Sequence, residues 1–234
     1  MITDNIEQRS AEWFRSRVGY LTGSRIADIM KSGKKKDDPW SEVAKSYMFQ
    51  VAGERIFNPD FLNDDDMFQS YIEQVSFTSK ALRWGQEQEE HAKSLFMELN
   101  FPDGEYAELS SCRHEDNSLL CGKSRWSNLR LRDGKSIKVI EVKCPNINTY
   151  MKYRTLIHDA ASLKETEPKY YWQMMAEMSC TGATSGYFIV YCPWLSKPIH
   201  WAEILRNDED VKTMEERVVM ANDYIDNIIN GNGK

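Results

Sequence analysis

The sequence predicts an α/β fold in which a central mixed β-sheet is flanked by helices. Between residues 106 and 191, short strand-like runs alternate with stretches of helical period. Helical patterns dominate on both sides of that region, and the chain has no internal repeat, low-complexity segment or convincing linker. We therefore expect a single domain over residues 1–234, with a core at about residues 7–192 and a C-terminal helix at about residues 209–229.

The composition is that of a soluble enzyme. The 234 residues are 41% hydrophobic, 12% aromatic and 28% charged, and no run approaches the roughly 20 apolar residues of a membrane span. The N-terminus lacks the basic and apolar regions of a secretory signal, so we expect an intracellular, cytoplasmic protein. The five cysteines form no C-x-x-C pair, which argues against a disulfide framework and a structural zinc site.

The net charge of −6 argues against one mode of nucleic-acid binding. Proteins that coat nucleic acid through bulk electrostatics are basic, so any contact of this chain with DNA must be local. Two groups of basic residues are candidates for such a contact, although each also fits a solvated surface. They are Lys31 with Lys34, Lys35 and Lys36, and the series Lys123, Arg125, Arg130, Arg132, Lys135 and Lys138.

Capping residues, hydrophobic spacing and turn residues predict the individual elements. Ser10 can cap a first helical turn, and Thr22 or Ser24 can cap a second helix in an opening at residues 9–31. The acidic stretch at residues 58–66 is expected to be an exposed loop. Further helices are expected at residues 40–51, 79–99, 148–158, 168–178 and 209–229, and strands at residues 108–112, 129–132, 136–142 and 186–191, the middle two joined by a hairpin turn at Asp133-Gly134.

The third predicted strand carries a charged pair. Successive side chains of a strand point to opposite sides, so Ile137, Val139, Glu141 and Lys143 share one face. Two apolar residues thus lead into a carboxylate and an ammonium at the edge of the core, where charges are costly unless they are paired or bind a metal. This pattern suits a metal-dependent nuclease, and it also suits a solvated ion pair at a strand end.

A second carboxylate stands out on the helix expected at residues 79–99. Ala92, Phe96 and Leu99 follow Glu89 at i+3, i+7 and i+10, so Glu89 lies in phase with an apolar stripe. A carboxylate in line with a core face either has a chemical role or marks the rim of the stripe and reaches water.

Four short segments occur in a specific order and spacing. They are Glu12–Gly19 followed by Leu21–Ser24, then Arg83–Glu89, then Ile140–Pro145, then Tyr170–Met178 followed by Thr181-Gly182. Together they resemble the YqaJ-like viral recombinase family, whose best-known member is the phage lambda exonuclease, within the PD-(D/E)xK nuclease superfamily. The resemblance implies a restriction-endonuclease-like core.

The resemblance also implies an activity and partners. Members are 5′→3′ exonucleases that degrade one strand of double-stranded DNA from an end and leave single strand for an annealing protein. They hold Mg²⁺ or Mn²⁺ with acidic side chains, and the lambda enzyme forms a ring of three subunits around DNA. A ring would let an acidic chain hold DNA, since basic residues need only line the channel. The resemblance suggests a phage or prophage protein in the host cytoplasm.

By the same resemblance, five residues would form the catalytic and metal site. Hydrolysis of a phosphodiester needs an activated water and stabilised charge on the oxygens, which a hard cation with carboxylate ligands supplies. Glu141 would be a direct metal ligand, and Val142 could offer its backbone carbonyl. Lys143 would position the attacking water or offset transition-state charge. Glu89 matches an additional acidic residue near the metals, and Gln173 would face the site.

Three further residues would bind the 5′-phosphate at the strand end. By position in the family motifs they are Arg17, Ser24 and Ser124. A guanidinium can grip two phosphate oxygens, and a serine near a helix N-terminus adds hydroxyl and backbone donors. Without the resemblance, Arg17 fits a surface residue and Ser24 a plain N-cap. Trp13 either packs at the duplex end or anchors the first helix.

One part of the family pattern is absent. Members carry a Ser-Pro-Asp-Gly type turn before the Glu-x-Lys strand, and its aspartate is the ligand between two metals, whereas this chain has Cys121–Asn128 there. Aligned on serine, Trp126 takes the aspartate's place; aligned on cysteine, Ser124 does. Three interpretations stay open: an exonuclease with a relocated carboxylate, a catalytically impaired nuclease-like protein that binds DNA ends or a recombination partner, and a restriction-type endonuclease.

Overall fold

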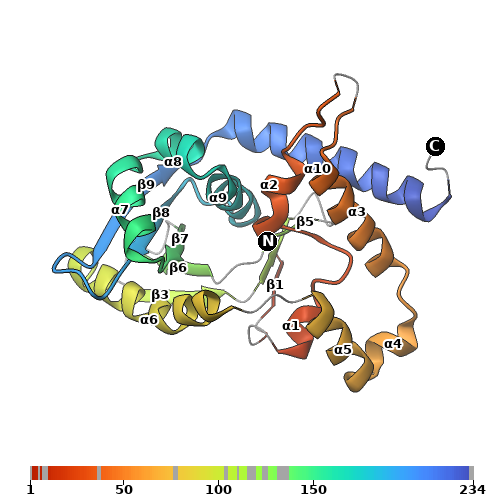
Figure 1. The fold of residues 1–234 in the computed structure, drawn as a ribbon, viewed down its shortest axis with the longest axis horizontal. Coiled ribbons are helices and arrows are strands. Elements are labelled where there is room, and N and C mark those ends of the chain that lie inside the picture. Colours follow the sequence, from red (N-terminus) through yellow and green to blue (C-terminus); the bar gives the residue numbers. More distant parts are fainter. Residues whose placement is uncertain are drawn as a thin grey trace.

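The computed structural model of the chain contains two β-sheets. It describes residues 2–4, 6, 10–35, 38–75, 79–102, 105–109, 111–114, 120–122, 126–130 and 137–231. In this described part, the larger sheet has the strand order β3-β6-β7-β8-β9 (Figure 1). Its strands are β3 (Glu105–Leu109), β6 (Trp126–Arg130), β7 (Ile137–Lys143), β8 (Ser185–Tyr191) and β9 (Ile199–Leu205). Only β7 and β8 pair in parallel there, which makes the sheet mixed, as predicted.

The smaller sheet joins the N-terminal region to the central one. Its order is β1-β4-β5-β2 among the described residues, and β2 pairs with β5 in parallel. The strands are β1 (Ile2–Asp4), β2 (Leu21–Thr22), β4 (Ser111–Arg113) and β5 (Leu120–Gly122). Residues 21–22 therefore lie beside residues 120–121, about a hundred positions later in the chain.

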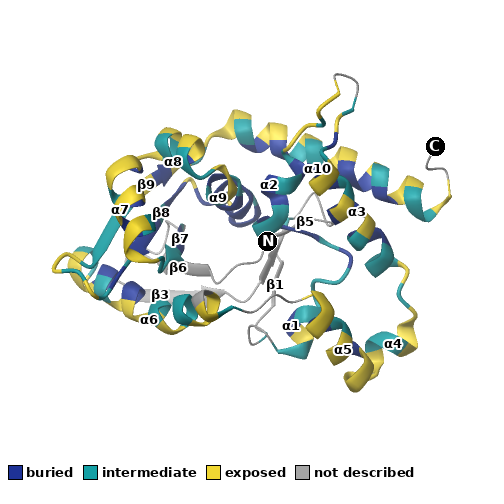
Figure 2. Cartoon of the chain, viewed as in Figure 1, coloured by how far each residue is buried: buried dark blue, intermediate teal, exposed yellow. Residues whose placement is uncertain are grey.

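Two helices cover opposite faces of the larger sheet. Helix α6 (Lys80–Asn100) places Phe96 and Met97 against Ile140 of β7, and helix α9 (Pro168–Thr181) packs in the main apolar cluster with Val139. Since Val139 and Ile140 are consecutive in a strand, their side chains point to opposite faces, and α6 and α9 lie on either side of the sheet (Figure 1). Helix α9 is almost entirely buried from Tyr171 onward (Figure 2).

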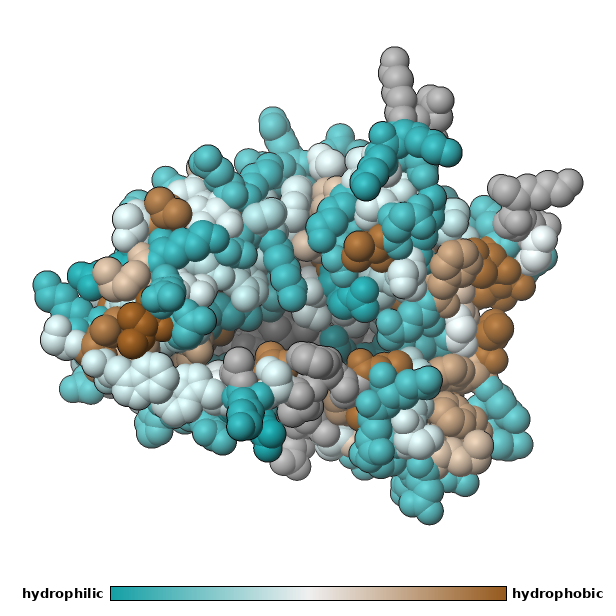
Figure 3. Space-filling model, in the orientation of Figure 1, coloured by the Kyte–Doolittle hydropathy of each residue, from teal (hydrophilic) through white to brown (hydrophobic). Residues whose placement is uncertain are grey.

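The remaining helices surround this sandwich. Near the N-terminus, η1 and α2 pack against α9, and the long C-terminal helix α10 packs against α3. Hydrophilic side chains dominate the face drawn in Figure 3, where apolar ones form small separate groups. The elements are α1 (Ala11–Arg15), η1 (Gly23–Arg25), α2 (Ile26–Ile29), α3 (Glu42–Arg55), α4 (Pro59–Asn63), α5 (Asp65–Val75), α7 (Ile147–Leu156), α8 (Ala160–Thr166) and α10 (Asp208–Ile229).

Two predictions about the fold are wrong. The strand expected at residues 108–112 is divided between β3, which ends at Leu109, and β4, which begins at Ser111, and the two strands belong to different sheets. Residues 58–66, expected to be an exposed loop, contain α4 and the start of α5. The Asn58 side chain accepts a hydrogen bond from the Asp60 amide, and the Asp64 side chain accepts one from the Met67 amide. Asn58 and Asp64 therefore cap helix starts, and the acidic side chains of the first turns interact favourably with the positive end of each helix dipole. The acidic stretch thus marks two helix starts and not a loop.

The other main elements agree with their predictions. The predicted helices at residues 40–51, 79–99 and 209–229 correspond to α3, α6 and α10, and the predicted strand at residues 136–142 corresponds to β7. Strands β6 and β7 pair antiparallel as a hairpin requires, while Asp133-Gly134 lies outside the described residues. No described helix is both long and apolar enough to cross a membrane.

Candidate active site

Strand β7 delivers a buried ion pair to the C-terminal edge of the larger sheet. Glu141 is only 4% exposed, and its Oε1 forms an ion pair with Nζ of Lys143. The Lys143 ammonium also lies 4.5 Å from the centroid of the Tyr170 ring on α9. Burial works to lower the pKa of Lys143, but the Glu141 carboxylate outweighs it, so the pKa lies above its usual value. Lys143 is therefore a cation throughout the neutral range.

Helix α6 supplies a second carboxylate with its own lysine. Oε1 of Glu89 lies 3.3 Å from Nζ of Lys93 one turn later, and the two side chains are 13% and 1% exposed. Burial and, next, the charge of Glu89 raise the pKa of the Cys144 thiol to about 12. Cys144 directly follows β7, so the Glu89 carboxylate lies near the end of that strand.

Glu89 and Lys143 line one cavity, here called the strand-end pocket, of about 280 Å³. Its wall combines the start of α6, the end of β7, and residues from α7 and α9. Glu141 shares its strand face with Lys143 and points toward the α9 side of the sheet, but it is not among the residues that line this pocket. The structure therefore brings the helix segment and the strand segment together at the sheet edge. The lining is Leu82, Gly85, Gln86, Glu89, Val142, Lys143, Cys144, Pro145, Thr149, Tyr153 and Tyr170.

Helix α9 adds a buried polar pair beside this ion pair. Nε2 of Gln173 donates a 3.0 Å hydrogen bond to Oε1 of Glu177, and the two residues are 3% and 1% exposed. The charge of Glu177 contributes to the raised pKa of Lys143, which places it on the same side of the sheet. Glu177 was not among the predicted site residues. The available signal was its i, i+4 spacing from Gln173.

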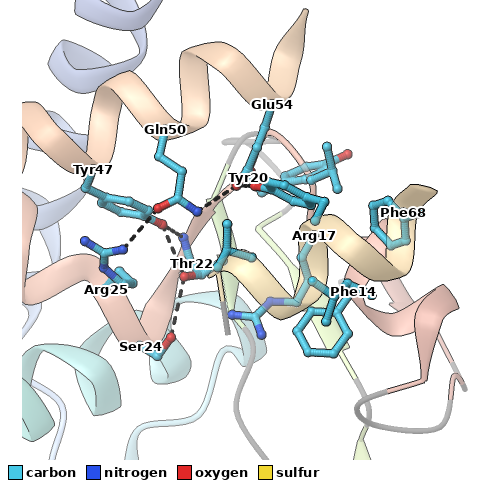
Figure 4. Close-up of a pocket in the computed structure, with 14 residues that line it drawn as sticks. Phe14, Arg17, Tyr20, Thr22, Ser24, Arg25, Tyr47, Gln50, Glu54 and Phe68 are labelled. Carbon is cyan, nitrogen blue, oxygen red and sulfur yellow. Dashed lines mark hydrogen bonds between the residues drawn. The ribbon is translucent and has the colours of Figure 1, made fainter. Parts of the chain in front are cut away.

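Arg17 and Ser24 line a second cavity of about 190 Å³, here called the N-terminal pocket (Figure 4). The hydroxyls of Ser24 and Thr22 are 3.5 Å apart. The Tyr47 hydroxyl lies 3.2 Å from the Thr22 hydroxyl and accepts a 2.8 Å hydrogen bond from the Thr22 amide. The Arg25 guanidinium stacks 4.1 Å from the centroid of the Tyr47 ring. Two guanidiniums, two small hydroxyls and a phenol thus meet in this pocket.

The charges in the N-terminal pocket are mixed. Burial raises the pKa of Tyr47, while the nearby charges of Arg25 and Arg17 work against that rise. Glu54 also lines the pocket, where one carboxylate oxygen accepts a 2.9 Å hydrogen bond from the Gly19 amide. Its carboxylate is thus engaged with the loop that carries Arg17. Arg25 and Tyr47 were not singled out by sequence, because only tertiary packing brings them together.

Trp13 anchors the first helix. It is 8% exposed, and the Arg17 guanidinium lies 4.2 Å from the centroid of its ring. This burial fits the anchoring role better than a contact with a duplex end, and the ring also holds the guanidinium end of the Arg17 side chain. Ser124, the third residue expected at the phosphate, lies outside the described residues, as does the side chain of Trp126.

The two pockets lie close together along the chain. Val75 lines the N-terminal pocket and Leu82 lines the strand-end pocket. Seven residues span at most ~25 Å, so Val75 of one pocket and Leu82 of the other are no farther apart than that.

The described residues match a hard dication in kind. The carboxylates of Glu89 and Glu141 and the backbone carbonyl of Val142 are oxygen donors of the sort that Mg²⁺ prefers. Within the described part of the chain, no three His, Cys, Asp or Glu side chains gather as a metal site. Each carboxylate is instead paired with a lysine. These residues would thus supply two carboxylates and one carbonyl.

Comparisons with known proteins agree with this architecture. A family model described as a YqaJ-like viral recombinase domain matches residues 12–184. The fold is similar to that of an alkaline exonuclease, LHK-Exo, from Laribacter hongkongensis, with a TM-score of 0.71 and 21% identity over 94% of this chain and 95% of that one. The same values hold for LHK-Exo in complex with dAMP.

A second solved structure is also similar. It is a phage related exonuclease from Haemophilus somnus 129PT, with a TM-score of 0.64 and 17% identity over 91% of this chain and 96% of that one. A search of curated proteins found no match. The structural likenesses confirm the predicted fold class, a mixed sheet flanked by helices with a nuclease-like core.

Proposed function

Because the chain belongs to the YqaJ-like viral recombinase family, we propose that it is a metal-dependent exonuclease that degrades one strand of double-stranded DNA from its ends in the 5′→3′ direction. The observation that carries this proposal is the meeting of Glu89 and Lys143 at one pocket, with Glu141 paired to that lysine. Metal-assisted phosphodiester hydrolysis needs carboxylates that can hold the metal and a positive charge that can stabilise the phosphate. These residues would supply both at the C-terminal end of β7.

In this proposal Glu141, Glu89 and the Val142 carbonyl hold Mg²⁺ or Mn²⁺. Such a cation, when bound there, would supply a water of lowered pKa and positive charge beside the phosphate. Lys143, kept protonated by Glu141, orients the attacking water and stabilises negative charge that develops on the phosphoryl oxygens. Its raised pKa makes it unsuited to act as a general base. Gln173 faces this region with its amide oriented by Glu177.

The N-terminal pocket would recognise the strand end. Arg17 grips oxygens of the 5′-phosphate, Ser24 adds a hydroxyl donor, and Ser124 completes the set from the segment before β6. Arg25 adds a second guanidinium in the same pocket. Recognition of a terminal phosphate favours an exonuclease over a restriction-type endonuclease, because an internal phosphodiester has no such group. The structurally similar LHK-Exo has been solved in complex with dAMP, a nucleoside monophosphate.

A second candidate function is a catalytically impaired protein that binds DNA ends or a recombination partner. Two observations favour it. The family's aspartate has no counterpart at Ser124 or Trp126. The carboxylates of Glu89 and Glu141 each already have a lysine partner. The retained set of Glu89, Glu141, Lys143 and Gln173 supports the enzyme, because a pure binding scaffold has no chemical need for it.

We also propose a domain organisation, a location, a partner protein and an oligomeric state. Residues 1–234 form one exonuclease-like domain that acts on double-stranded DNA ends in the cytoplasm of a phage or prophage host. A single-strand annealing protein receives the exposed strand, and three copies form a ring around DNA.

Digestion of three substrates tests the proposal. Linear duplex with a 5′-phosphate, the same duplex without it, and a closed circle are each incubated with the protein in Mg²⁺ and in Mn²⁺. The proposal predicts loss of linear DNA only, fastest with the phosphate. Nicked circles would indicate an endonuclease, and a gel shift without products would indicate the binding protein.

A further inference from the structure

Glu54 on α3 joins three segments around the N-terminal pocket through one carboxylate. Its Oε2 accepts a 2.9 Å hydrogen bond from the amide of Gly19, in the loop between α1 and β2. Its Oε1 accepts one of 2.8 Å from Nε2 of Gln50 and one of 2.5 Å from the hydroxyl of Tyr71 on α5. A carboxylate can accept all three because it has about four acceptor positions, whereas a side-chain amide has a single acceptor oxygen.

Two consecutive residues of α3 hold the Gly19 peptide from both sides. While Glu54 takes the amide, Nε of Arg55 donates a 2.9 Å hydrogen bond to the Gly19 carbonyl. Gly19 has a φ of +78°, and a Cβ at this position would lie 3.0 Å from Cγ of Arg55. The Tyr20 amide also donates a 3.1 Å hydrogen bond to the Arg17 carbonyl. The tight loop that carries Arg17 is therefore fixed against α3.

The same carboxylate sets the orientation of Arg25 through Gln50. Since a carboxylate only accepts hydrogen bonds, the NH₂ group of Gln50 faces Glu54 and the Gln50 oxygen faces away. That oxygen accepts a 3.4 Å hydrogen bond from Nη1 of Arg25, and Figure 4 shows the links from Arg25 to Gln50 to Glu54. The guanidinium is also held by Asp28, which accepts a 2.9 Å hydrogen bond from its Nε, and by the Tyr47 ring.

A negative charge is an unfavourable neighbour for a phosphate. Glu54 lines the same pocket as Arg17 and Arg25, and its charge alone would repel an anion bound there. A neutral side chain could join α3 to α5 without that repulsion. The capacity of the carboxylate to accept several hydrogen bonds, and so to hold the supports of two basic side chains, explains it better than a plain tie between helices does.

We propose that Glu54 is the positioning residue of the N-terminal pocket, which fixes Arg17 and Arg25 so that both guanidiniums bind the terminal phosphate of a DNA strand. This inference rests on the proposed function, in which that pocket takes the 5′-phosphate. Glu54 acts through the two arginines and not on the phosphate itself.

The test measures binding of duplex ends in EDTA, so that no cleavage is needed. The probes are two dye-labelled hairpin duplexes with one blunt end each, identical except for a 5′-phosphate or a 5′-hydroxyl at that end. Fluorescence anisotropy gives both dissociation constants, and their ratio is the preference for phosphate. The proteins are the wild type, E54Q, Q50L and E42Q. The last is the control, because Glu42 lies exposed in the first turn of the same helix.

The sign of the change in E54Q separates positioning from charge. Loss of the negative charge alone would raise the preference for phosphate, whereas loss of positioning lowers it. We expect E54Q to lower the preference by about 10-fold or more, the effect of losing one hydrogen bond to a charged group, with binding of the hydroxyl end unchanged. Q50L leaves the Gly19 link intact and should lower the preference by about 2- to 10-fold. E42Q should bind both probes as the wild type does.

Several results would overturn the positioning role. One is a preference that stays the same or rises in E54Q, and another is equal weakening of both probes, which indicates a structural tie. Thermal unfolding checks the fold of each variant, and if E54Q does not fold, an unchanged preference in Q50L overturns the role. Equal binding of both probes by the wild type would overturn it together with the proposed phosphate site. A preference that E54Q lowers, without cleavage of any duplex in Mg²⁺ or Mn²⁺, would keep the role and refute the nuclease instead.

Discussion

Replacement of Lys93 by methionine should cost much of the stability of α6 packing. Lys93 is 1% exposed and its ammonium lies 3.3 Å from Oε1 of Glu89. At an effective dielectric constant of about 20, Coulomb's law gives an attraction of ~5 kcal/mol at that distance. Desolvation of both ions offsets most of this gain, but removal of one partner leaves the other charge in place without it.

We expect K93M to lower the free energy of unfolding by about 3 kcal/mol. Breaking a buried ion pair usually costs about 3–5 kcal/mol, and the low end applies here because Glu89 keeps some exposure to solvent. The double variant E89Q/K93M should recover at least half of the loss, because the carboxylate that faced Lys93 is then neutral as well. Urea unfolding monitored by circular dichroism measures each value. K80M, on an exposed lysine of the same helix, should change the free energy of unfolding by less than about 0.5 kcal/mol.

The reasoning would be refuted by a K93M loss below about 1 kcal/mol, or by additive effects of E89Q and K93M. Coupling energies of about 0.5–3 kcal/mol are normal for residues in direct contact. Additivity would mean that the ion pair does not form in solution.

Three further predictions concern the site. E141Q should reduce cleavage of linear duplex by more than about 100-fold, since loss of a direct ligand exceeds the effect of losing outer partners; activity within tenfold of wild type would contradict this. R17A should reduce the preference for a 5′-phosphate over a 5′-hydroxyl end by about 10- to 150-fold, the effect of losing one hydrogen bond to a charged group. An unchanged ratio of the two digestion rates would mean that Arg17 does not bind the phosphate. The pKa of Lys143 is raised in the folded state, so its contribution to stability is complete below the ordinary pKa of 10.5 and is lost as the pH rises through the folded-state pKa. The difference in unfolding free energy between wild type and K143M should therefore be flat from about pH 6 to pH 9 and shrink above about pH 10.5; a difference that shrinks below pH 9 would contradict the ion pair.

Strand β7 could be predicted because its signal is local. Alternation in Ile137–Lys143 fixes which side chains share a face, and Val139 is fully buried as that pattern requires. Ile140 on the other face is buried too, because α6 covers it, and this depends on a partner far along the chain. Strand β9 escaped prediction, since its side chains alternate in burial only over the last four residues.

The residues of the two pockets show the same limit. Glu89 was found because it stands in phase with Phe96 on one helix, a relation that sequence spacing contains. Lys93 was missed, although it stands four residues after Glu89 and three before Phe96 on the same helix face. Arg25 and Tyr47 come from segments 22 positions apart, and only the packing of η1 against α3 makes them neighbours.

The central claim is that Glu89 from a helix and Glu141 with Lys143 from a strand converge to hold a dication beside a phosphate. A crystal structure of the protein soaked in Mn²⁺, with anomalous scattering recorded at the manganese edge, tests it most directly. We predict an anomalous peak in direct coordination with the carboxylates of Glu89 and Glu141 and the carbonyl of Val142. A peak elsewhere, or none while both lysine pairs stay intact, would contradict the account.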